Sequence, residues 1–207
     1  KINKLIKVSE VTRIETTLSS DAMAGRKTFS TGIDKAASFI ADEFAKAGLQ
    51  FAGSNNSFLQ SFEMLESIVA DGNATLDGVA VPASQIICQT SLEYLSFSEA
   101  DQYEVVSINA TDNFMQAYRG VRGKTNHLLV LIDTTHRAIF ERLKRNSGPR
   151  FASPANQVYV LTAHARPTRF QVAVNMRIQK HSLANVVGII PGKSKPDEYV
   201  IFSGHYD

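Results

Sequence analysis

The run Leu128-Leu129-Val130-Leu131-Ile132 places the strongest constraint on the fold, because it is apolar at every position. A strand with one face in water alternates apolar and polar side chains, whereas a strand covered on both faces is apolar throughout. The run therefore predicts a buried strand with a packed layer on each side.

Two helices are expected near the N-terminus. The first has an apolar stripe at helical spacing, formed by Val8, Val11, Ile14 and Leu18. The second covers residues 32–47, where Thr31 with Asp34 resembles a capping box and Gly48 fits a left-handed C-terminal cap. A further helix is expected over residues 137–145, which Ser147-Gly148-Pro149 would end.

The pattern changes between residues 66 and 169, where short strand-like runs follow one another. These runs are residues 74–76, 79–81, 85–88, 103–108, 127–132 and 157–162. We therefore expect a β-rich unit at residues 66–169, inserted between two outer pieces, residues 1–65 and 170–207.

The last part of the chain returns to long strands. Residues 170–178 alternate apolar and polar side chains, and residues 184–190 predict another strand. A turn is expected over residues 191–197. The apolar residues Tyr199-Val200-Ile201-Phe202 then predict a buried strand that leads into Gly204-His205-Tyr206-Asp207.

The segment Gly204-His205-Tyr206-Asp207 is the most informative candidate for chemistry. In α/β sheets, ligands bind at the carboxyl ends of strands, which is where the expected strand over residues 199–202 places His205. Neutral imidazole is a good zinc ligand, and a carboxylate two residues away can orient it. A surface histidine in a loop is the alternative interpretation of the same residues.

Several further segments occur in a specific order on either side of the expected insert. Before it lie residues 18–26, Ser30-Thr31-Gly32, Gly48-Leu49 and Gln60-Ser61-Phe62. After it come residues 185–192, residues 198–202 and Gly204-His205-Tyr206-Asp207. In this order the segments resemble the M28 family of zinc metallopeptidases. The resemblance covers about residues 8–65 and 180–207, and the stretch between them resembles, by its position, the protease-associated insert of this family.

The resemblance implies the N-terminal portion of a zinc-exopeptidase-like α/β core with an inserted β-rich domain. His205 would ligate one of two zinc ions, and Asp207 would orient it. The family's remaining ligands and general base would lie beyond Asp207. One histidine and one carboxylate do not close a zinc site, so we expect this chain alone neither to bind zinc tightly nor to hydrolyse peptides.

For the parent protein, the resemblance implies an aminopeptidase that removes N-terminal residues from peptides. A glutaminyl-cyclase-like zinc acyltransferase is an alternative within the same fold. A non-catalytic module that binds peptides or proteins is an alternative from another class. The resemblance also implies export, so we expect a periplasmic or extracellular protein whose signal peptide has been removed, with Lys1 to Lys7 near a mature N-terminus.

Composition excludes several classes of protein. Of the 207 residues, 43% are apolar and 20% are charged, as in soluble globular proteins. The net charge of +2 gives no general attraction to nucleic acid or anionic membranes, and no apolar stretch approaches the roughly 20 residues of a membrane span. We expect a peptide substrate for the parent, with neither a nucleic-acid partner nor a membrane span.

Other polar residues have less specific interpretations. Cys88 lies in an apolar run and is expected to be a buried thiol. Asp21 and Arg26 are expected to support the core by packing or through an ion pair. Four further histidines are expected to be structural or exposed, namely His127, His136, His164 and His181. A basic cluster is expected to be a solvated helix face rather than a nucleic-acid site, and comprises Arg137, Arg142, Lys144, Arg145 and Arg150.

Overall fold

A computed structural model describes residues 6–195 and 197–207. Residues 1–5, part of the expected mature N-terminus, and residue 196, part of the expected turn, lie outside the described residues. The chain forms two compact units. The terminal unit comprises Lys1–Glu63 and Ser182–Asp207, and the middle unit comprises Met64–His181. Helices and strands occur in both, so the α/β class is confirmed at that level.

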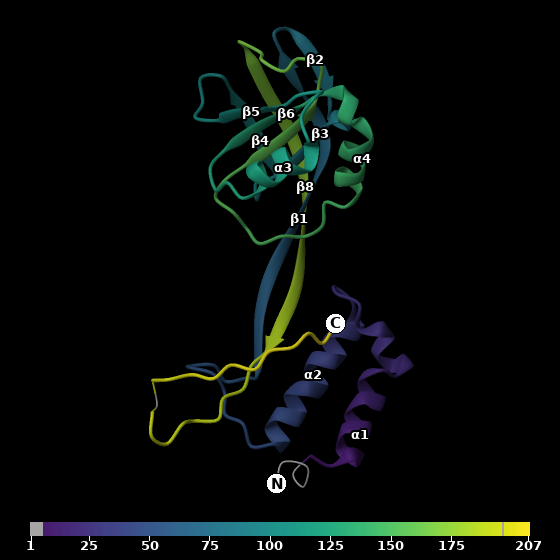
Figure 1. Cartoon of the computed structure of the whole chain (residues 1–207), viewed down its shortest axis with the longest axis vertical. Coiled ribbons are helices and arrows are strands. Elements are labelled where there is room, and N and C mark those ends of the chain that lie inside the picture. The colour runs from purple at the N-terminus through teal and green to yellow at the C-terminus, as the bar shows by residue number, and fades with distance from the viewer. Residues whose placement is uncertain (1–5, 196) are drawn as a thin grey trace. The chain divides into compact units, whose positions relative to one another are not determined.

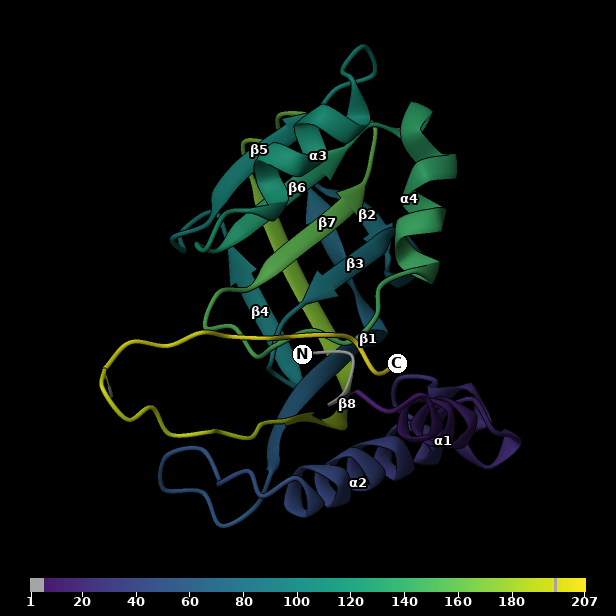
Figure 2. The same ribbon diagram turned by 60° about the horizontal axis from the view of Figure 1, so that its bottom comes forward.

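A mixed four-stranded sheet lies at the centre of the middle unit (Figures 1 and 2). Its strands, in spatial order, are β3 (Ile86–Gln89), β7 (Gln157–Leu161), β6 (Leu128–Ile132) and β5 (Glu104–Ile108). β5, β6 and β7 run parallel to one another, and β3 pairs antiparallel with β7. The amino-terminal ends of β6 and β7 therefore lie beside the carboxyl end of β3.

A second, antiparallel sheet packs against the first. Its strands, in spatial order, are β2 (Val79–Pro82), β1 (Leu59–Leu76), β8 (Phe170–Val186) and β4 (Tyr94–Ser98). The portions of β1 and β8 within Met64–His181 belong to the middle unit. Short 3-10 turns occupy Ala83–Gln85 and Thr134–His136.

Two helices, α3 (Phe114–Arg122) and α4 (Arg137–Arg145), cover the other face of the mixed sheet. In Figure 2 they lie on the viewer's side of that sheet, with β1 and β8 behind it. Phe114 and Val121 of α3 and Phe140 of α4 join one apolar cluster with side chains of the mixed sheet. The middle unit is thus built in three layers, two helices, a mixed sheet and an antiparallel sheet.

β6 confirms the prediction of a strand covered on both faces. Leu129 and Leu131 point toward the antiparallel sheet, whereas Leu128, Val130 and Ile132 join the cluster beneath the helices. Each side chain of the strand is buried. The apolar run is continuous because the period-two alternation of a strand directs successive residues into two different cores.

The terminal unit contains α1 (Val8–Leu18), a 3-10 segment (Asp21–Arg26) and α2 (Thr31–Lys46). Ser30, rather than Thr31, is the N-cap of α2, and its hydroxyl accepts a hydrogen bond from the Gly32 N–H at 3.3 Å. The expected capping box at Thr31 and Asp34 is therefore wrong by one position. Thr31 is already helical, so its hydroxyl does not serve as the cap.

The expected left-handed cap at Gly48 is confirmed. Gly48 has φ of +76°, which a glycine adopts without a steric penalty. The Leu49 N–H donates to the Phe44 carbonyl at 3.1 Å, so a terminal carbonyl of α2 gains a partner.

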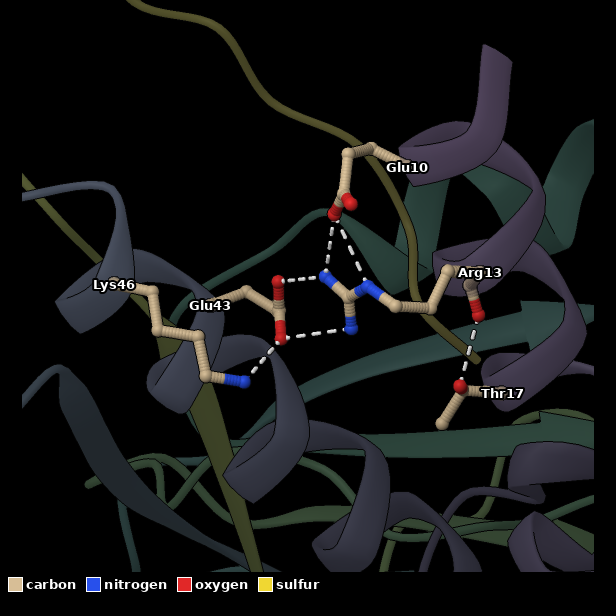
Figure 3. A network of polar contacts seen from close by, with 5 residues as sticks. All are labelled: Glu10, Arg13, Thr17, Glu43 and Lys46. Carbon is tan, nitrogen blue, oxygen red and sulfur yellow. Dashed lines mark hydrogen bonds and ion pairs between the residues drawn. The ribbon is translucent and has the colours of Figure 1, made fainter. Parts of the chain in front are cut away.

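An exposed ion network joins α1 to α2 (Figure 3). The Arg13 guanidinium contacts both oxygens of Glu43, and it also contacts Glu10 one turn earlier at 3.1 Å. Lys46 contacts Glu43 at 2.7 Å. These cations hold the pKa of Glu43 at about 2, mainly through the hydrogen bond from Arg13.

The structure corrects three expectations about the last part of the chain. Residues 170–178 were expected in the outer pieces, but they pair with β4 inside the middle unit. The separate strand at residues 184–190 is instead the end of the continuous strand β8, which stops at Val186, followed by an isolated bridge between Gln50 and Ile189.

The third correction concerns Tyr199-Val200-Ile201-Phe202, which were expected to form a buried strand. They form no strand, and Phe202 is 94% exposed. A strand needs a hydrogen-bonded neighbour, and no described residue pairs with this run.

Within the described ranges, no helix is both long enough and apolar enough to cross a membrane.

Candidate functional site

His205 and Asp207, the residues selected from sequence, lie in contact in the terminal unit. His205 Nδ1 is 3.0 Å from Asp207 Oδ1. A neutral His205 would carry its proton on Nδ1 to donate to this carboxylate, which would leave Nε2 as the acceptor. The side chain of His205 is 95% exposed and that of Asp207 is 44% exposed, so Nε2 is open to an incoming ligand.

Tyr206 anchors the segment between these two residues. Its hydroxyl donates to the Ala184 carbonyl, and its ring is half-buried. Burial raises the pKa of Tyr206, and the negative charges of Asp34 and Asp207 raise it further. The tyrosine therefore remains a neutral donor at physiological pH, and it fixes the backbone from which His205 and Asp207 project.

His205 and Asp207 supply one imidazole ligand and one carboxylate that orients it, which is less than a complete metal site requires. Across residues 6–195 and 197–207, no group of three His, Cys, Asp or Glu side chains is placed to hold a metal ion. Structural and catalytic zinc sites use three or four protein ligands. His205 could thus contribute one bond to zinc.

Cys88 is buried in the middle unit, as expected. The residue is 2% exposed, and burial raises the pKa of its thiol to about 12. The thiolate required of a nucleophile is therefore scarce at neutral pH. Cys88 packs instead in the apolar core between the two sheets.

Three of the remaining histidines have structural contacts. His127 Nδ1 accepts a hydrogen bond from the Asn156 N–H at 3.1 Å, and His136 Nε2 lies 2.9 Å from the Asn109 carbonyl oxygen. His181 Nε2 lies 3.1 Å from a Glu66 carboxylate oxygen. His164 is exposed. These contacts agree with the structural or exposed roles expected of the four residues.

Arg26 connects its loop to α1 through a hydrogen bond to the helix backbone. Its guanidinium donates to the Leu18 carbonyl, one of the last carbonyls of that helix. Ala24, Gly25 and Arg26 all have positive φ, which turns the chain back toward α1. Arg26 therefore acts as a C-terminal partner for the helix.

A second candidate site, which sequence did not single out, is a cavity of about 180 Å³ in the middle unit. It lies beside the amino-terminal ends of β6 and β7 and the carboxyl end of β3. Its wall includes Arg122 at the end of α3, together with Lys124 and Arg150 from two loops. Gln89 and Gln157, which pair across β3 and β7, also line it.

A buried polar network stiffens one wall of this cavity. The Thr90 hydroxyl donates to Asn156 Oδ1 at 2.6 Å and accepts from the Leu92 N–H at 3.1 Å. The Asn156 side-chain amide lies 3.3 Å from the Tyr103 hydroxyl oxygen. Because these buried groups are paired, their positions are fixed by hydrogen bonds as well as by packing.

The cavity could not be found from sequence because its cations come from distant segments. The sequence predicts that Arg150 shares a helix face with the basic residues of 137–145, but Arg150 lies beyond α4 and lines the cavity instead. Arg122 lies 28 positions away in the sequence, at the end of a helix that was not predicted. The one relevant feature in the sequence was that Arg150 comes just after Ser147-Gly148-Pro149, which places it in a loop rather than on the preceding helix.

No protein-family model, no curated protein and no solved structure matches this chain. The resemblance to zinc peptidases therefore remains a prediction from sequence.

Proposed function

We propose that this chain is the N-terminal portion of a zinc-dependent aminopeptidase, in which His205 ligates a metal ion and Asp207 orients it. The observation that carries the proposal is the 3.0 Å contact between His205 Nδ1 and the Asp207 carboxylate, with the remaining ring nitrogen open to solvent. Metal-binding histidines commonly donate their second ring N–H to a carboxylate in this manner.

The roles of the two side chains follow from their contact. Asp207 accepts the Nδ1 proton, which selects the tautomer whose Nε2 lone pair can bind a metal ion. The carboxylate also increases the basicity of the ring and restricts its rotation. Tyr206 holds the intervening backbone through its bond to the Ala184 carbonyl, so the pair is attached to β8 at a fixed point.

A bound pair of zinc ions would lower the pKa of a water molecule and polarise the peptide carbonyl. The chain's own contribution is to present His205 three residues after the end of the exposed run Tyr199-Val200-Ile201-Phe202. Four consecutive apolar side chains in water are unusual in a soluble protein. In the proposed enzyme this run forms a strand of the core sheet, paired with further parts of the protein. We also propose that the enzyme is periplasmic or extracellular.

One observation favours the binding-module alternative. The middle unit contains a cavity with cationic walls and has its own core, as a module that captures peptides would require. In the glutaminyl-cyclase-like alternative, His205 would also be a zinc ligand. The two activities are distinguished by their reaction products.

The test uses the natural protein encoded by the complete gene, loaded with zinc. We expect it to release p-nitroaniline from aminoacyl p-nitroanilides, and to lose that activity when the amino group is acetylated. A peptide with N-terminal glutamine separates the alternatives, because a cyclase releases ammonia and leaves a pyroglutamyl peptide. Zinc-loaded protein that cleaves no aminoacyl reporter refutes the aminopeptidase proposal.

Variants then test the assigned residues. His205→Ala is expected to abolish turnover and reduce the bound zinc, whereas Asp207→Asn should weaken zinc binding about 10–100-fold. His164→Ala is the matched control, because His164 is also an exposed histidine but lies in the middle unit. Equal zinc content and activity in wild type and His205→Ala would show that His205 is not a ligand.

A further inference from the structure

The cavity beside β6 and β7 carries a positive charge that is only partly compensated. Its walls contain Arg122, Lys124 and Arg150, and no described Asp or Glu lines it. Lys124 pairs with Glu104 outside the cavity. Neither arginine has a carboxylate partner within residues 6–195 and 197–207, so two guanidinium groups remain available to an anion.

Arg150 is the more constrained of the two arginines. Its main chain forms an isolated bridge with Leu65, with N–H to carbonyl distances of 2.9 and 2.7 Å in the two directions. The residue is half-buried. Burial lowers the pKa of its guanidinium, and the nearby charge of Arg122 lowers it further. A half-buried cation beside a second cation gains from any anion that binds between or beside them.

Neutral donors line the same cavity. The Gln89 amide makes no hydrogen bond with any described residue, so it can donate to a ligand. Within the described part of the chain, the Ser91 hydroxyl makes one long contact as a donor, 3.4 Å to the Ser153 carbonyl. By contrast, the Gln157 amide is occupied by the Lys124 carbonyl and the Tyr159 hydroxyl, so it serves to shape the wall.

The cavity also has an apolar part, formed by Leu65, Phe151 and Ala155. The volume of about 180 Å³ is many times the roughly 15 Å³ that a single water requires, so a group of several heavy atoms fits. The cavity therefore offers guanidinium groups and amide donors together with a small apolar surface.

We propose that this cavity binds the oxyanion group of a small ligand, a carboxylate or a phosphate, through Arg122 and Arg150. A guanidinium presents its N–H groups in a planar fork that matches two oxygens of either anion. Gln89 supplies a further donor, and the apolar wall accepts the carbon atoms next to a carboxylate. This proposal is independent of the metal site and concerns the middle unit alone.

The experiment follows the arginine side-chain Nε–H resonances of the intact 207-residue chain by NMR during titration. The probes are sodium phosphate, sodium acetate and N-acetyl-alanyl-phenylalanine as the free acid and as the amide, with sodium chloride as the ionic-strength control. We expect saturable shifts at Arg122 and Arg150 with phosphate or with a free carboxylate, and none with the amide. Tighter binding by the peptide acid than by acetate and phosphate would assign the site to a carboxylate, and the reverse order to a phosphate.

Matched variants separate specific binding from general attraction. Arg150→Gln and, separately, Arg122→Gln should each weaken binding about tenfold or more, because each removes a charged hydrogen-bond donor. Arg150→Lys keeps the charge but loses the planar fork, so it should weaken binding by a smaller factor. Arg145→Gln is the control, since Arg145 is an exposed arginine of α4 that does not line the cavity.

Circular dichroism and amide NMR spectra establish that each variant is folded before it is titrated. If Arg150→Gln unfolds the middle unit, Arg122→Gln still tests the site, because Arg122 is exposed. The proposal is overturned if no probe produces a saturable shift. It is also overturned if chloride reproduces the shifts, or if Arg145→Gln weakens binding as much as the cavity variants.

Discussion

The middle unit and the terminal unit differ most in how they cover their apolar residues. In the middle unit, side chains of both sheets and two helices form two clusters whose central residues are buried. Among the described residues of the terminal unit, the buried hydrophobic ones are Met23, Ile33, Ala36, Ala37 and Phe58. Apolar residues of α1 and the run Tyr199-Val200-Ile201-Phe202 remain in water.

This difference shows that an apolar pattern predicts burial only where a partner layer is present. The run Leu128–Ile132 is buried because helices cover one face of β6 and a second sheet covers the other. The run at residues 199–202 is equally apolar, but no described strand pairs with it. Hydrophobic patterning therefore indicates which side chains favour burial, and the surrounding structure decides whether they are buried.

The interactions that stabilise each unit internally also differ. Packing between layers dominates in the middle unit. In the terminal unit, α1 buries no residue, and Arg13 connects it to α2 through a partly exposed ion pair with Glu43. Exposed ion pairs contribute little to stability compared with buried apolar contacts. We therefore expect α1 to open more readily than the core strands.

The largest expected effect tests the contrast between the buried and exposed apolar residues. Phe140→Ala removes a fully buried ring of α4 and should lower the free energy of unfolding of the middle unit by about 3–5 kcal/mol. Phe202→Ala makes the same change at a side chain that is 94% exposed, and should alter stability by less than about 0.5 kcal/mol. Urea unfolding followed by circular dichroism measures both. Similar losses in the two variants would contradict the contrast.

A smaller effect is expected from the same substitution at one glycine in each unit. A Cβ on Gly32 would lie 2.2 Å from the Met23 carbonyl oxygen, so the 3-10 segment must move. Gly32→Ala should therefore destabilise the terminal unit by about 1–3 kcal/mol despite the better helix propensity of alanine. In α3, Gly120 has no atom near that position, and Gly120→Ala should stabilise by about 0.5–1 kcal/mol.

Hydrogen exchange resolved by residue measures the two glycine variants within their own units. Faster exchange in α2 of Gly32→Ala, together with slower exchange in α3 of Gly120→Ala, is the expected pair of results. Stabilisation by both substitutions would mean that the close approach of Gly32 to Met23 does not constrain the terminal unit.

The smallest effect concerns the dependence of the α1–α2 contact on pH. The folded pKa of Glu43 is about 2, below the ordinary value of 4.5, because Arg13 and Lys46 favour the carboxylate. A depressed pKa means that the stabilisation is complete above pH 4.5 and is lost as pH falls toward 2. A carboxyl carbon titration by NMR should show this midpoint.

The Arg13→Gln variant tests whether Arg13 causes the low pKa of Glu43. Removing the guanidinium should raise the midpoint of Glu43 toward its ordinary value, whereas Arg145→Gln in α4 should leave it unchanged. An unchanged midpoint in Arg13→Gln would show that the network in Figure 3 does not hold the carboxylate.

The sequence alone was sufficient where local rules determine structure. The bounds of α1 and α4 followed from helical periodicity and from the residues that end each helix. The left-handed cap at Gly48 and the buried strand at Leu128–Ile132 followed in the same way. In each case the relevant interactions lie within a few residues, or the pattern itself specifies two covered faces.

Only the tertiary structure revealed β4, α3 and the true lengths of β1 and β8. The extents of the three strands depend on pairing with residues far away in the sequence, as between Tyr94 and Asn175. Such pairing leaves a weak local signal, because a strand is completed by its neighbour rather than by its own residues.

The two candidate sites also differ in whether sequence alone could identify them. His205 and Asp207 could be selected from sequence because they are two residues apart, and the 3.0 Å contact lies within that short segment. Arg122 and Arg150 could not, since only the parallel arrangement of β6 and β7 brings their segments to one edge of the sheet. Sequence determines the chemical groups of a chain, and tertiary structure decides which distant groups share a cavity.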